Sequence, residues 1–477
     1  MVGKEISRIV LKEVEPTDLQ TTLDRMSVLV DPVSGLVRSI IPNWIETGDP
    51  HIFAFGAVTS QASLATMRPF IVRAGGAAIE RDRAIAATIG EAVERYCAAH
   101  ADPDDFIFAS YDELTEEAVH PADFSLHSAR QYQQPGFPFQ PFTPEAKVTW
   151  TWGYSLVKER PVLIPVSQTF LLQETPLPFP VYRTDGPRTA SDMNEHMGEH
   201  KDIKVGDTTS TGLACGNSIE EAILSAIGEV IERDALACFW LGKHPARGIV
   251  IDEGSAIFET FKEKFALRGL QYYVCDITTD LGIPTIFTLL VGGSNDGVMV
   301  NAGSQASLSP TRAALKSVVE AAHGRPYVRF ILQSDQAWQY RPDFSNVNSF
   351  PSHAAFYTRS PQHHDALDFI KNPVSVRNLS AMRDLSTGTI LGDLKLYLKI
   401  LSNRGFDVIV KDLTTPDIED VGLKIVRVLI PGLQLLHGDH RYPFLGCPRL
   451  YRMSKSLGFS EHVTGEDNLN PYPHPLP

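Results

Sequence analysis

The residues best suited to chemistry are glutamates that recur in a short pattern. The stretch from Glu91 to Arg95 and the stretch from Glu229 to Arg233 both read Glu-x-x-Glu-Arg. Within a helix, glutamates three residues apart lie side by side, and their like charges repel unless a cation lies close to them. Because Mg²⁺ binds carboxylate and phosphate oxygens, two such pairs indicate a site for magnesium and a triphosphate.

The second copy belongs to a longer acidic stripe. Glu221, Ser225, Glu229 and Glu232 fall within one narrow arc of a helix that turns by about 100° per residue. The residues between them are largely apolar, which predicts a buried helix. Buried carboxylates need metal ions or arginines as partners.

A structural interpretation is open for the same residues. Glu91 and Arg95, like Glu229 and Arg233, have the four-residue spacing of ion pairs that only support a helix. Glu221 follows Ser218 by three residues, which is the spacing of a capping box. Two copies in apolar helices favour the functional interpretation.

A third helix is predicted to begin after Ser309, with Pro310 in its first turn. Glu320 and His323 share one of its faces, and Arg325 follows. Two interpretations stay open. His323 and Arg325 could stabilise the end of the helix against its dipole, or Arg325 could be directed at a phosphate.

Composition limits the class of protein. The chain has 477 residues, which predicts more than one subdomain. Its net charge of −14 disfavours a nucleic-acid partner. No apolar run reaches the roughly 20 residues of a membrane helix. The five cysteines are scattered without a Cys-x-x-Cys pair, so we expect neither a disulfide framework nor a zinc knuckle, and we expect a cytoplasmic location.

Strands and helices alternate along the chain, which predicts an α/β fold of mixed α+β layers. The polar stretch 184–207 is predicted to be a mobile loop, a lid over a site. We expect strands at 8–14, 148–157, 160–172, 271–277, 284–291, 406–412 and 423–430, and helices at 17–26, 81–100, 218–240, 256–267, 310–322 and 394–403.

Several segments, in this order, resemble the YcaO family over most of the chain, from about Arg73 to the end. No single segment is specific to this family, but the order in which they follow one another along the chain is. They are a Gly-Gly loop at Gly75–Gly76, the first Glu-x-x-Glu-Arg, a Gly-Leu-Ala-x-Gly turn at Gly212–Gly216, the second Glu-x-x-Glu-Arg-Asp ending at Asp234, a Glu-x-x-x-x-Arg helix at Glu320–Arg325, and a proline-alternating end at Pro471–Pro477.

The resemblance implies a YcaO-type ATP-binding fold in which two acidic helices face each other across the nucleotide. It implies that Mg²⁺ is bound by Glu91, Glu94, Glu229 and Glu232. It also implies nucleotide or phosphate contacts from Gly75, Gly76, Arg95, Asn217, Glu221, Arg233 and Arg325, and catalytic roles for Glu320, Arg325 and Pro477.

The implied activity is that of an ATP-dependent cyclodehydratase subunit, as in the biosynthesis of thiazole/oxazole-modified microcins. Alternating prolines from Pro471 to Pro477 force an extended tail, whose terminal carboxylate the family places near the active site. A Cys, Ser or Thr side chain of a ribosomally made precursor would attack the preceding amide carbonyl. The oxygen would take the γ-phosphoryl group, and loss of phosphate would leave an azoline ring.

The expected organisation is an N-terminal segment (1–70), a catalytic ATP-binding domain (71–450) and a tail that completes the active site (451–477). No peptide-binding module is evident in the N-terminal segment. We therefore expect a separate partner that binds the precursor's leader peptide, a homodimer, and a role for a flavin-dependent dehydrogenase as a further partner.

The chain departs from the family pattern at four positions. Ala77 stands where lysine is common, Ala87 where serine is, Thr211 where asparagine is and His323 where glutamine is. Ala77 and Ala87 remove two phosphate contacts, so the implied metal site is better supported than the nucleotide contacts. Two alternatives stay open, a thioamide- or amidine-forming enzyme and a non-catalytic nucleotide-binding scaffold.

Overall fold

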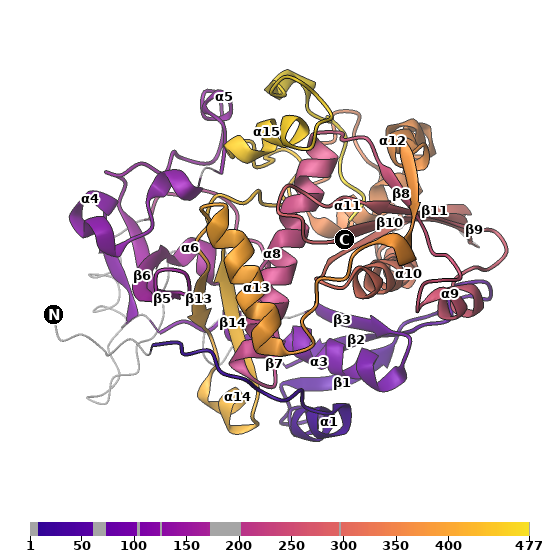
Figure 1. Cartoon of the computed structure of the whole chain (residues 1–477), viewed down its shortest axis with the longest axis horizontal. Coiled ribbons are helices and arrows are strands. Elements are labelled where there is room, and N and C mark those ends of the chain that lie inside the picture. Colours follow the sequence, from indigo (N-terminus) through magenta and orange to yellow (C-terminus); the bar gives the residue numbers. More distant parts are fainter. Residues whose placement is uncertain are drawn as a thin grey trace.

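A computed structural model describes residues 8–60, 73–102, 105–124, 126–171, 202–294 and 297–476. Within these residues the strands form three sheets, and helices pack between and outside them (Figure 1). The predicted mixture of helices and strands is therefore confirmed. Among the described helices, none is both long enough and apolar enough to cross a membrane.

The three sheets surround the central helix α8 (Figure 1). A six-stranded sheet lies on one side of α8 and a five-stranded sheet on the other. The small sheet has the antiparallel order β1 (Val37–Pro42), β2 (Phe53–Thr59), β3 (Arg73–Ala78). The five-stranded sheet has the order β11 (Gly297–Ala306), β10 (Thr285–Ser294), β9 (Leu270–Asp276), β8 (Arg247–Val250), β12 (Ser375–Asn378), and the six-stranded sheet has β4 (Ile107–Ala109), β5 (Val148–Ser155), β13 (Ile409–Asp412), β14 (Lys424–Leu429), β7 (Leu213–Gly216), with β6 (Arg160–Pro165) paired to β5.

Three strand–helix units organise the centre of the molecule. In each, a strand leads into a long helix: β3 into α3 (Arg81–Ala98), β7 into α8 (Ile219–Leu241), and β11 into α10 (Pro310–Ser334). Helix α8 is apolar on nearly all sides, as its sequence predicts, and packs into a core with β14 at one end and a core with β10 and α11 (Phe350–Arg359) at the other. Its acidic stripe is therefore held rigidly.

The remaining α-helices are α1 (Leu19–Ser27), α4 (Tyr111–Leu114), α5 (Ala129–Tyr132), α6 (Val166–Thr169), α9 (Phe258–Lys264), α12 (Asp368–Lys371), α13 (Ile390–Asn403), α14 (Pro416–Asp420) and α15 (Pro448–Ser456). Of these, α13 and α15 pack against α8 and the others lie around the sheets (Figure 1).

Several expected elements differ from the structure. Residues 8–14 run extended without a strand partner, and the Lys12 amide instead donates to Glu220 at 3.1 Å. Gly75–Gly76 is not a loop but part of β3, where it pairs with β2. The turn at Gly212–Gly216 is confined to Gly212, whose φ is +86°, because the next four residues form β7.

Two more expected elements have different ends in the structure, and two expectations are not tested by it. The strand expected at 160–172 ends at Pro165, and α6 follows it. Helix α10 does not end near Ala322 but continues through Pro326 to Ser334. Most of the expected lid, residues 184–201, lies outside the described residues. The division at residue 70 stays a prediction, although β1 and β2 share a sheet with β3.

Candidate active site

Each strand–helix unit binds a glutamate of its own helix through a backbone N–H in or next to its own strand. The donor precedes the glutamate by nearly the same number of residues in all three units, so the geometry recurs. The pairs are Gly75 N to Glu91 Oε2 at 2.7 Å, Gly212 N to Glu229 Oε2 at 3.1 Å, and Ser304 N to Glu320 Oε2 at 2.7 Å.

A second set of hydrogen bonds joins neighbouring units. Cys215 N, in β7, donates to Glu94 Oε1 of α3 at 2.7 Å. Ser304 Oγ, in β11, donates to Glu232 Oε1 of α8 at 2.7 Å. These bonds bring carboxylates from three helices into one place. We call this set the carboxylate cradle: Glu91, Glu94, Glu229, Glu232 and Glu320.

Glycines let two of the helices approach their strands closely enough for these bonds. A Cβ on Gly76 would lie 2.5 Å from Thr88 N of α3. A Cβ on Gly303 would lie 2.4 Å from Ser317 O of α10. Each glycine is adjacent to the residue that donates to the glutamate. The Gly-Gly pair therefore has a structural role in orienting Glu91, and its contact with nucleotide stays a prediction.

The cradle carboxylates repel each other in a setting poor in water. Burial, together with the charges of Glu229 and Glu91, raises the pKa of Glu94 to about 8. Burial and the charge of Glu320 raise the pKa of Glu232 to about 8 despite the attraction of Arg233. Burial also raises the pKa of Glu229 and of Glu320. Without a cation, the cradle holds protons at neutral pH.

Arginines supply part of the missing positive charge. Arg95 Nη2 lies 2.5 Å from Glu91 Oε1, and Arg233 lies 3.6 Å from both Glu229 and Glu232. The four-residue ion pairs expected from the sequence therefore exist. Two arginines leave the cradle with more negative than positive charges, so divalent ions fit it.

The donor set suits Mg²⁺, which prefers oxygen ligands and often takes one or two carboxylates together with phosphate oxygens. Among the described residues, no three carboxylates bring their oxygens within 4.8 Å of one another. A single ion enclosed by protein is therefore not favoured. The arrangement fits ions shared between one or two glutamates and a phosphate chain.

Basic residues missed by the sequence analysis lie beside the cradle. Lys316 is one helical turn before Glu320 on α10, and its side chain is exposed to solvent. Surrounding protein nevertheless lowers its pKa, helped by Arg312 and Arg83 and opposed by Glu232 and Glu320. Because Lys316 is exposed and lies on the same helix as Glu320, its ammonium group is available to a phosphate. The only signal in the sequence was the spacing of Lys316 and Glu320.

Asn217 and Glu221 lie at the other end of the stripe. Ser218 caps α8 as expected, but Glu221 does not return the bond to Ser218, since its carboxylate accepts from Asn217 N at 2.9 Å. The Asn217 side chain contacts α1 through Arg25 and Thr22, at 3.2 and 3.0 Å. From Glu221 to Glu232 the stripe extends about 16 Å at the usual helical rise, which suits an elongated ligand.

Arg325 has protein partners outside the cradle. Its Nε lies 2.6 Å from Asp49 Oδ1, its Nη2 donates to Gly293 O at 2.6 Å, and its side chain is 1% exposed. Because α10 continues to Ser334, the interpretation of Arg325 as a helix-end residue is wrong. A phosphate contact or catalytic role for Arg325 stays a prediction. His323, whose pKa burial lowers to about 4, lies beside Asn43 and Gly75.

The C-terminal tail enters the centre of the molecule beside α8 (Figure 1). Trp240 Nε1 donates to Tyr472 O, and Tyr357 Oη donates to Pro473 O, both at 2.8 Å. Burial lowers the pKa of His474 to about 3, and the charges of His440 and Arg233 add to this shift. Pro477 lies outside the described residues.

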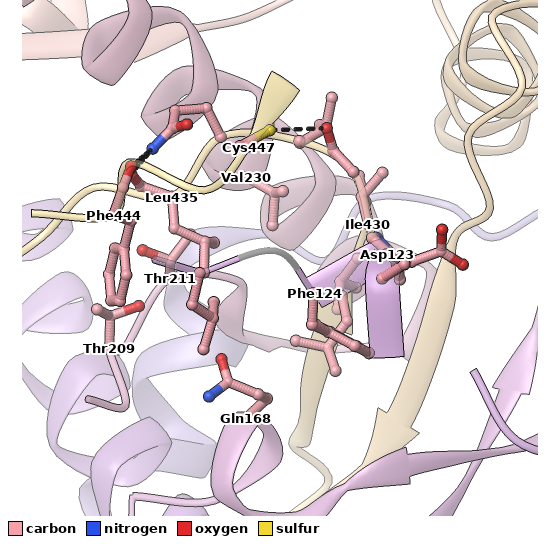
Figure 2. A pocket seen from close by; sticks show the side chains of 18 of the residues that line it. Asp123, Phe124, Gln168, Thr209, Thr211, Val230, Ile430, Leu435, Phe444 and Cys447 are labelled. Carbon is pink, nitrogen blue, oxygen red and sulfur yellow. Dashed lines mark hydrogen bonds between the residues drawn. The ribbon is translucent and has the colours of Figure 1, made fainter. Parts of the chain in front are cut away.

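A cavity lined by Val230 of α8 and by residues of β14 lies where α8 packs on β14 (Figure 2). Gln168, Thr209 and Thr211 line it together with Arg427 of β14. Arg427 Nη2 donates to the Gln168 and Thr209 carbonyls at 3.0 and 2.9 Å. Its Nε and Nη1, and the Gln168 amide nitrogen, are buried without a partner in the part of the chain that is described. Burial lowers the pKa of Arg427 to about 10. The sequence analysis did not single out Arg427, because it lies within an apolar stretch. Its buried charge can bind a polar group of a ligand.

The cradle predicts how stability depends on pH. The pKa of Glu94 and of Glu232 rises from 4.5 when unfolded to about 8 when folded, so between these values the folded chain holds more protons. In EDTA, the melting temperature should therefore fall as pH rises from about 5 to about 8. Mg²⁺ with a non-hydrolysable ATP analogue should reverse this fall, because metal ions displace the protons.

Thermal unfolding across this pH range, with EDTA or with Mg²⁺ and analogue, measures the effect. Glu94→Gln should make the EDTA profile flatter, whereas Glu263→Gln on the exposed side of α9 should not change it. A flat profile for the unmodified chain in EDTA would contradict these electrostatics.

Known proteins share both the sequence pattern and the fold. Residues 75–434 match the family model described as YcaO cyclodehydratase, ATP- and Mg²⁺-binding. An uncharacterized protein of Methanothermobacter thermautotrophicus is 30% identical over 237 residues, which are 49% of this chain and 57% of that protein. An uncharacterized protein in the tfuA 3' region of Rhizobium leguminosarum bv. trifolii is 35% identical over 130 residues, 25% of this chain and 31% of that protein.

Solved structures with low sequence identity have the same fold. A heterocyclase in complex with substrate and cofactor has a TM-score of 0.73 at 22% identity, covering 98% of this chain and 59% of that chain. YcaO from Methanopyrus kandleri bound with AMPPCP and Mg²⁺ has a TM-score of 0.56 at 15% identity, covering 88% and 91%. The match to the family model spans most of the chain, and it includes both Glu-x-x-Glu-Arg helices and α10. The chain therefore belongs to the YcaO family.

Proposed function

We propose that this chain is the ATP-dependent subunit of a peptide cyclodehydratase. It would form thiazolines or oxazolines from Cys, Ser or Thr residues of a ribosomally made precursor peptide. The observation that carries the proposal is the carboxylate cradle, in which strand amides orient glutamates of three helices beside Arg95 and Arg233. The similarity to a heterocyclase and to a YcaO protein bound with AMPPCP and Mg²⁺ supports it.

In this proposal the cradle binds Mg²⁺ through Glu91, Glu94, Glu229 and Glu232, with Glu320 beside them. The bound ions would neutralise the phosphates of ATP. Arg233 and Lys316 would add positive charge where charge moves during phosphoryl transfer. Glu221, about 12 Å from Glu229 along α8, and Asn217, just before α8 begins, would contact the nucleoside end. These residues would position ATP and neutralise the charge of its phosphates, which is the main requirement of phosphoryl transfer.

The peptide itself supplies the nucleophile. Its thiol or hydroxyl would add to the preceding amide carbon, and the proton would pass to a base of the chain. This addition closes the ring, and the former amide oxygen would then take the γ-phosphoryl group and release ADP. Phosphate would leave as the ring nitrogen loses its proton and forms the C=N bond of the azoline. The cavity lined by Val230 and Arg427 is suited to hold part of the peptide, because the buried nitrogens of Arg427 and Gln168 can donate to a carbonyl.

The tail is proposed to complete the active site. Tyr472, Pro473 and His474 are held in place by hydrogen bonds, and Leu476 is fully buried. The carboxylate that Pro477 carries in this chain would act as the base for the attacking thiol or hydroxyl.

Removing Pro477 should reduce ring formation about 100-fold or more, the range typical of general bases, and leave nucleotide affinity unchanged. Pro477→Ala is the matched control, because it keeps a carboxylate at the same chain position, and it should stay active. Initial rates from mass spectrometry and Kd values for an ATP analogue measure the two effects. Equal activity of the truncated chain and Pro477→Ala would exclude the proposed base.

Assembly with other proteins is part of the proposal. Within the described residues 8–60, the strands β1 and β2 pair with each other, and β2 pairs with β3, so both belong to one sheet with β3. We propose that a separate protein binds the leader peptide, that the chain forms a homodimer, and that a flavin-dependent dehydrogenase can oxidise the rings afterwards.

The proposed function is tested by incubating the chain with Mg²⁺, ATP, the leader-binding partner and a Cys-, Ser- and Thr-rich precursor. Mass spectrometry should show loss of one water per modified residue, and the phosphate released should match it. A mass change that replaces oxygen by sulfur would instead indicate thioamide formation. Nucleotide binding without peptide change or phosphate release would indicate a scaffold.

A further inference from the structure

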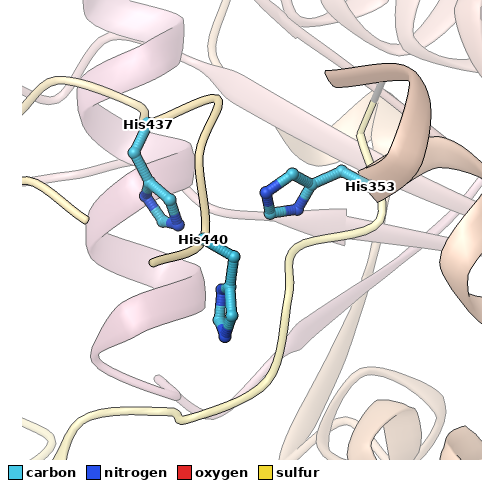
Figure 3. Close-up of side chains that lie close together, drawn as sticks. All are labelled: His353, His437 and His440. Atoms are coloured by element: carbon cyan, nitrogen blue, oxygen red, sulfur yellow. The ribbon is translucent and has the colours of Figure 1, made fainter. Parts of the chain in front are cut away.

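Three histidines from separate parts of the chain bring ring nitrogens together beside the tail. His353 lies on α11, and His437 and His440 lie in the segment between β14 and α15. One nitrogen of each lies within 4.8 Å of the others. Figure 3 shows the three rings grouped around one space. Among the described residues, no other group of three His, Cys, Asp or Glu side chains converges in this way.

Hydrogen bonds show which ring nitrogens carry a proton and which have a free lone pair. His353 Nδ1 lies 3.0 Å from the His474 carbonyl oxygen, and His440 Nε2 lies 3.0 Å from the Pro471 carbonyl oxygen. A carbonyl only accepts, so these two nitrogens carry the protons. His353 Nε2 and His440 Nδ1 therefore carry no proton, and each has a free lone pair.

The remaining nitrogens lack partners in a buried setting. His353 Nε2, His440 Nδ1 and both ring nitrogens of His437 have no hydrogen-bond partner within the described parts of the chain. His353 is 0% exposed and His437 is 2% exposed. A buried unpartnered polar group costs about 1–3 kcal/mol, so several together need an explanation.

We propose that His353, His437 and His440 form a zinc site. Neutral imidazoles are preferred zinc ligands, and a metal-bound histidine commonly donates its other N–H to a backbone carbonyl, as His353 and His440 do here. Zn–N bonds of about 2.0–2.1 Å put ligand nitrogens about 3.3 Å apart, so binding requires small side-chain rotations. Three histidines leave a fourth position for water. The cradle offers only oxygen ligands and selects a different ion.

The zinc ion would hold the tail in place. His474 stacks on His353 with ring centroids 3.7 Å apart, and its Nε2 donates to the His437 carbonyl at 2.8 Å. The metal would link α11 to the segment that carries His437 and His440. Both α11 and this segment form hydrogen bonds with tail residues 471–474. This inference does not depend on the proposed reaction, since it concerns only the order of the tail.

The full chain, stripped with EDTA and then supplied with Zn²⁺ in excess Mg²⁺, tests the site. After desalting, elemental analysis should find one Zn²⁺ per chain, and Co²⁺ in its place should give the visible absorption of a four-coordinate site. His437→Asn and His440→Asn should retain less than a tenth of the metal. His462→Asn, an exposed histidine near the tail, is the matched control and should retain all of it.

Two more outcomes decide the proposal. Zn²⁺ should raise the melting temperature of the unmodified chain and slow proteolysis of its tail, a result that needs no variant to fold. Zinc retained by both histidine variants but lost in Glu229→Gln would place it in the cradle and overturn the proposal. So would a chain that binds no zinc.

Discussion

Glu229→Gln should lower the rate of ATP-dependent ring formation by about two to three orders of magnitude, the range seen when a charge-stabilising group is removed from an active site. Glutamine keeps the acceptor for the Gly212 amide and nearly the same volume, so folding should not change. It removes one negative charge between Glu94 and Arg233. Mg²⁺ affinity in the presence of nucleotide should fall with the rate.

Steady-state phosphate release and titration of Mg²⁺ with an ATP analogue measure this effect. Glu263→Gln, an exposed glutamate on α9, is the control for removing a carboxylate elsewhere and should behave as the unmodified chain. A Glu229→Gln chain that forms rings within about threefold of the normal rate would remove the cradle from the mechanism.

Asp49→Ala should reduce the free energy of unfolding by about 3–5 kcal/mol, because it leaves the buried Arg325 without its charge partner and leaves Arg329 paired with Glu46 alone. Asp49 lies 2.6 Å from Arg325 Nε and 3.0 Å from Arg329 Nη2. Burial would raise the pKa of Asp49, but the hydrogen bond from Arg325 and the two positive charges hold it below its ordinary value. Arg325 Nη1 has no partner among the described residues, and after the substitution Arg325 would keep only the bond to the Gly293 carbonyl, so the loss falls mainly on Arg325.

Urea denaturation gives the change in unfolding free energy. Asp335→Ala, at an exposed position after α10, is the control and should change it by less than about 0.5 kcal/mol. A loss below about 1 kcal/mol for Asp49→Ala would mean that the arginines find other partners. That result would leave Arg325 free to contact phosphate, as the family resemblance implies.

The sequence predicted the parts of the site that lie within one helix. The paired glutamates of α3 and α8 follow from spacing alone, because a helix puts positions three apart on one face. The same holds for the Ser218 cap and for the burial of α8. Long elements with a strong period, such as β10 and α13, were likewise predicted close to their observed bounds.

The sequence could not show what orients the glutamates. The donors at Gly75, Gly212, Cys215 and Ser304 are backbone amides, and backbone groups leave no trace in a pattern of side chains. Strand β11 was missed because it contains small and polar residues that pack against α10 instead of an alternating apolar pattern.

Groups assembled from distant segments were also missed. The three histidines of the proposed zinc site are brought together only by packing of α11 against the segment after β14. The third helix was expected to end near Ala322, yet α10 continues through Pro326 to Ser334, which places Arg325 and Arg329 beside Asp49.

The central claim is that the amide oxygen of the peptide leaves on the phosphate of ATP. A precursor with a heavy oxygen isotope in the carbonyl before one modifiable Cys tests it directly. After a single round with Mg²⁺, ATP, the partner and this chain, mass spectrometry of the released phosphate should find the label in step with ring formation. Rings formed while the label appears in water, with unlabelled phosphate, would contradict the account.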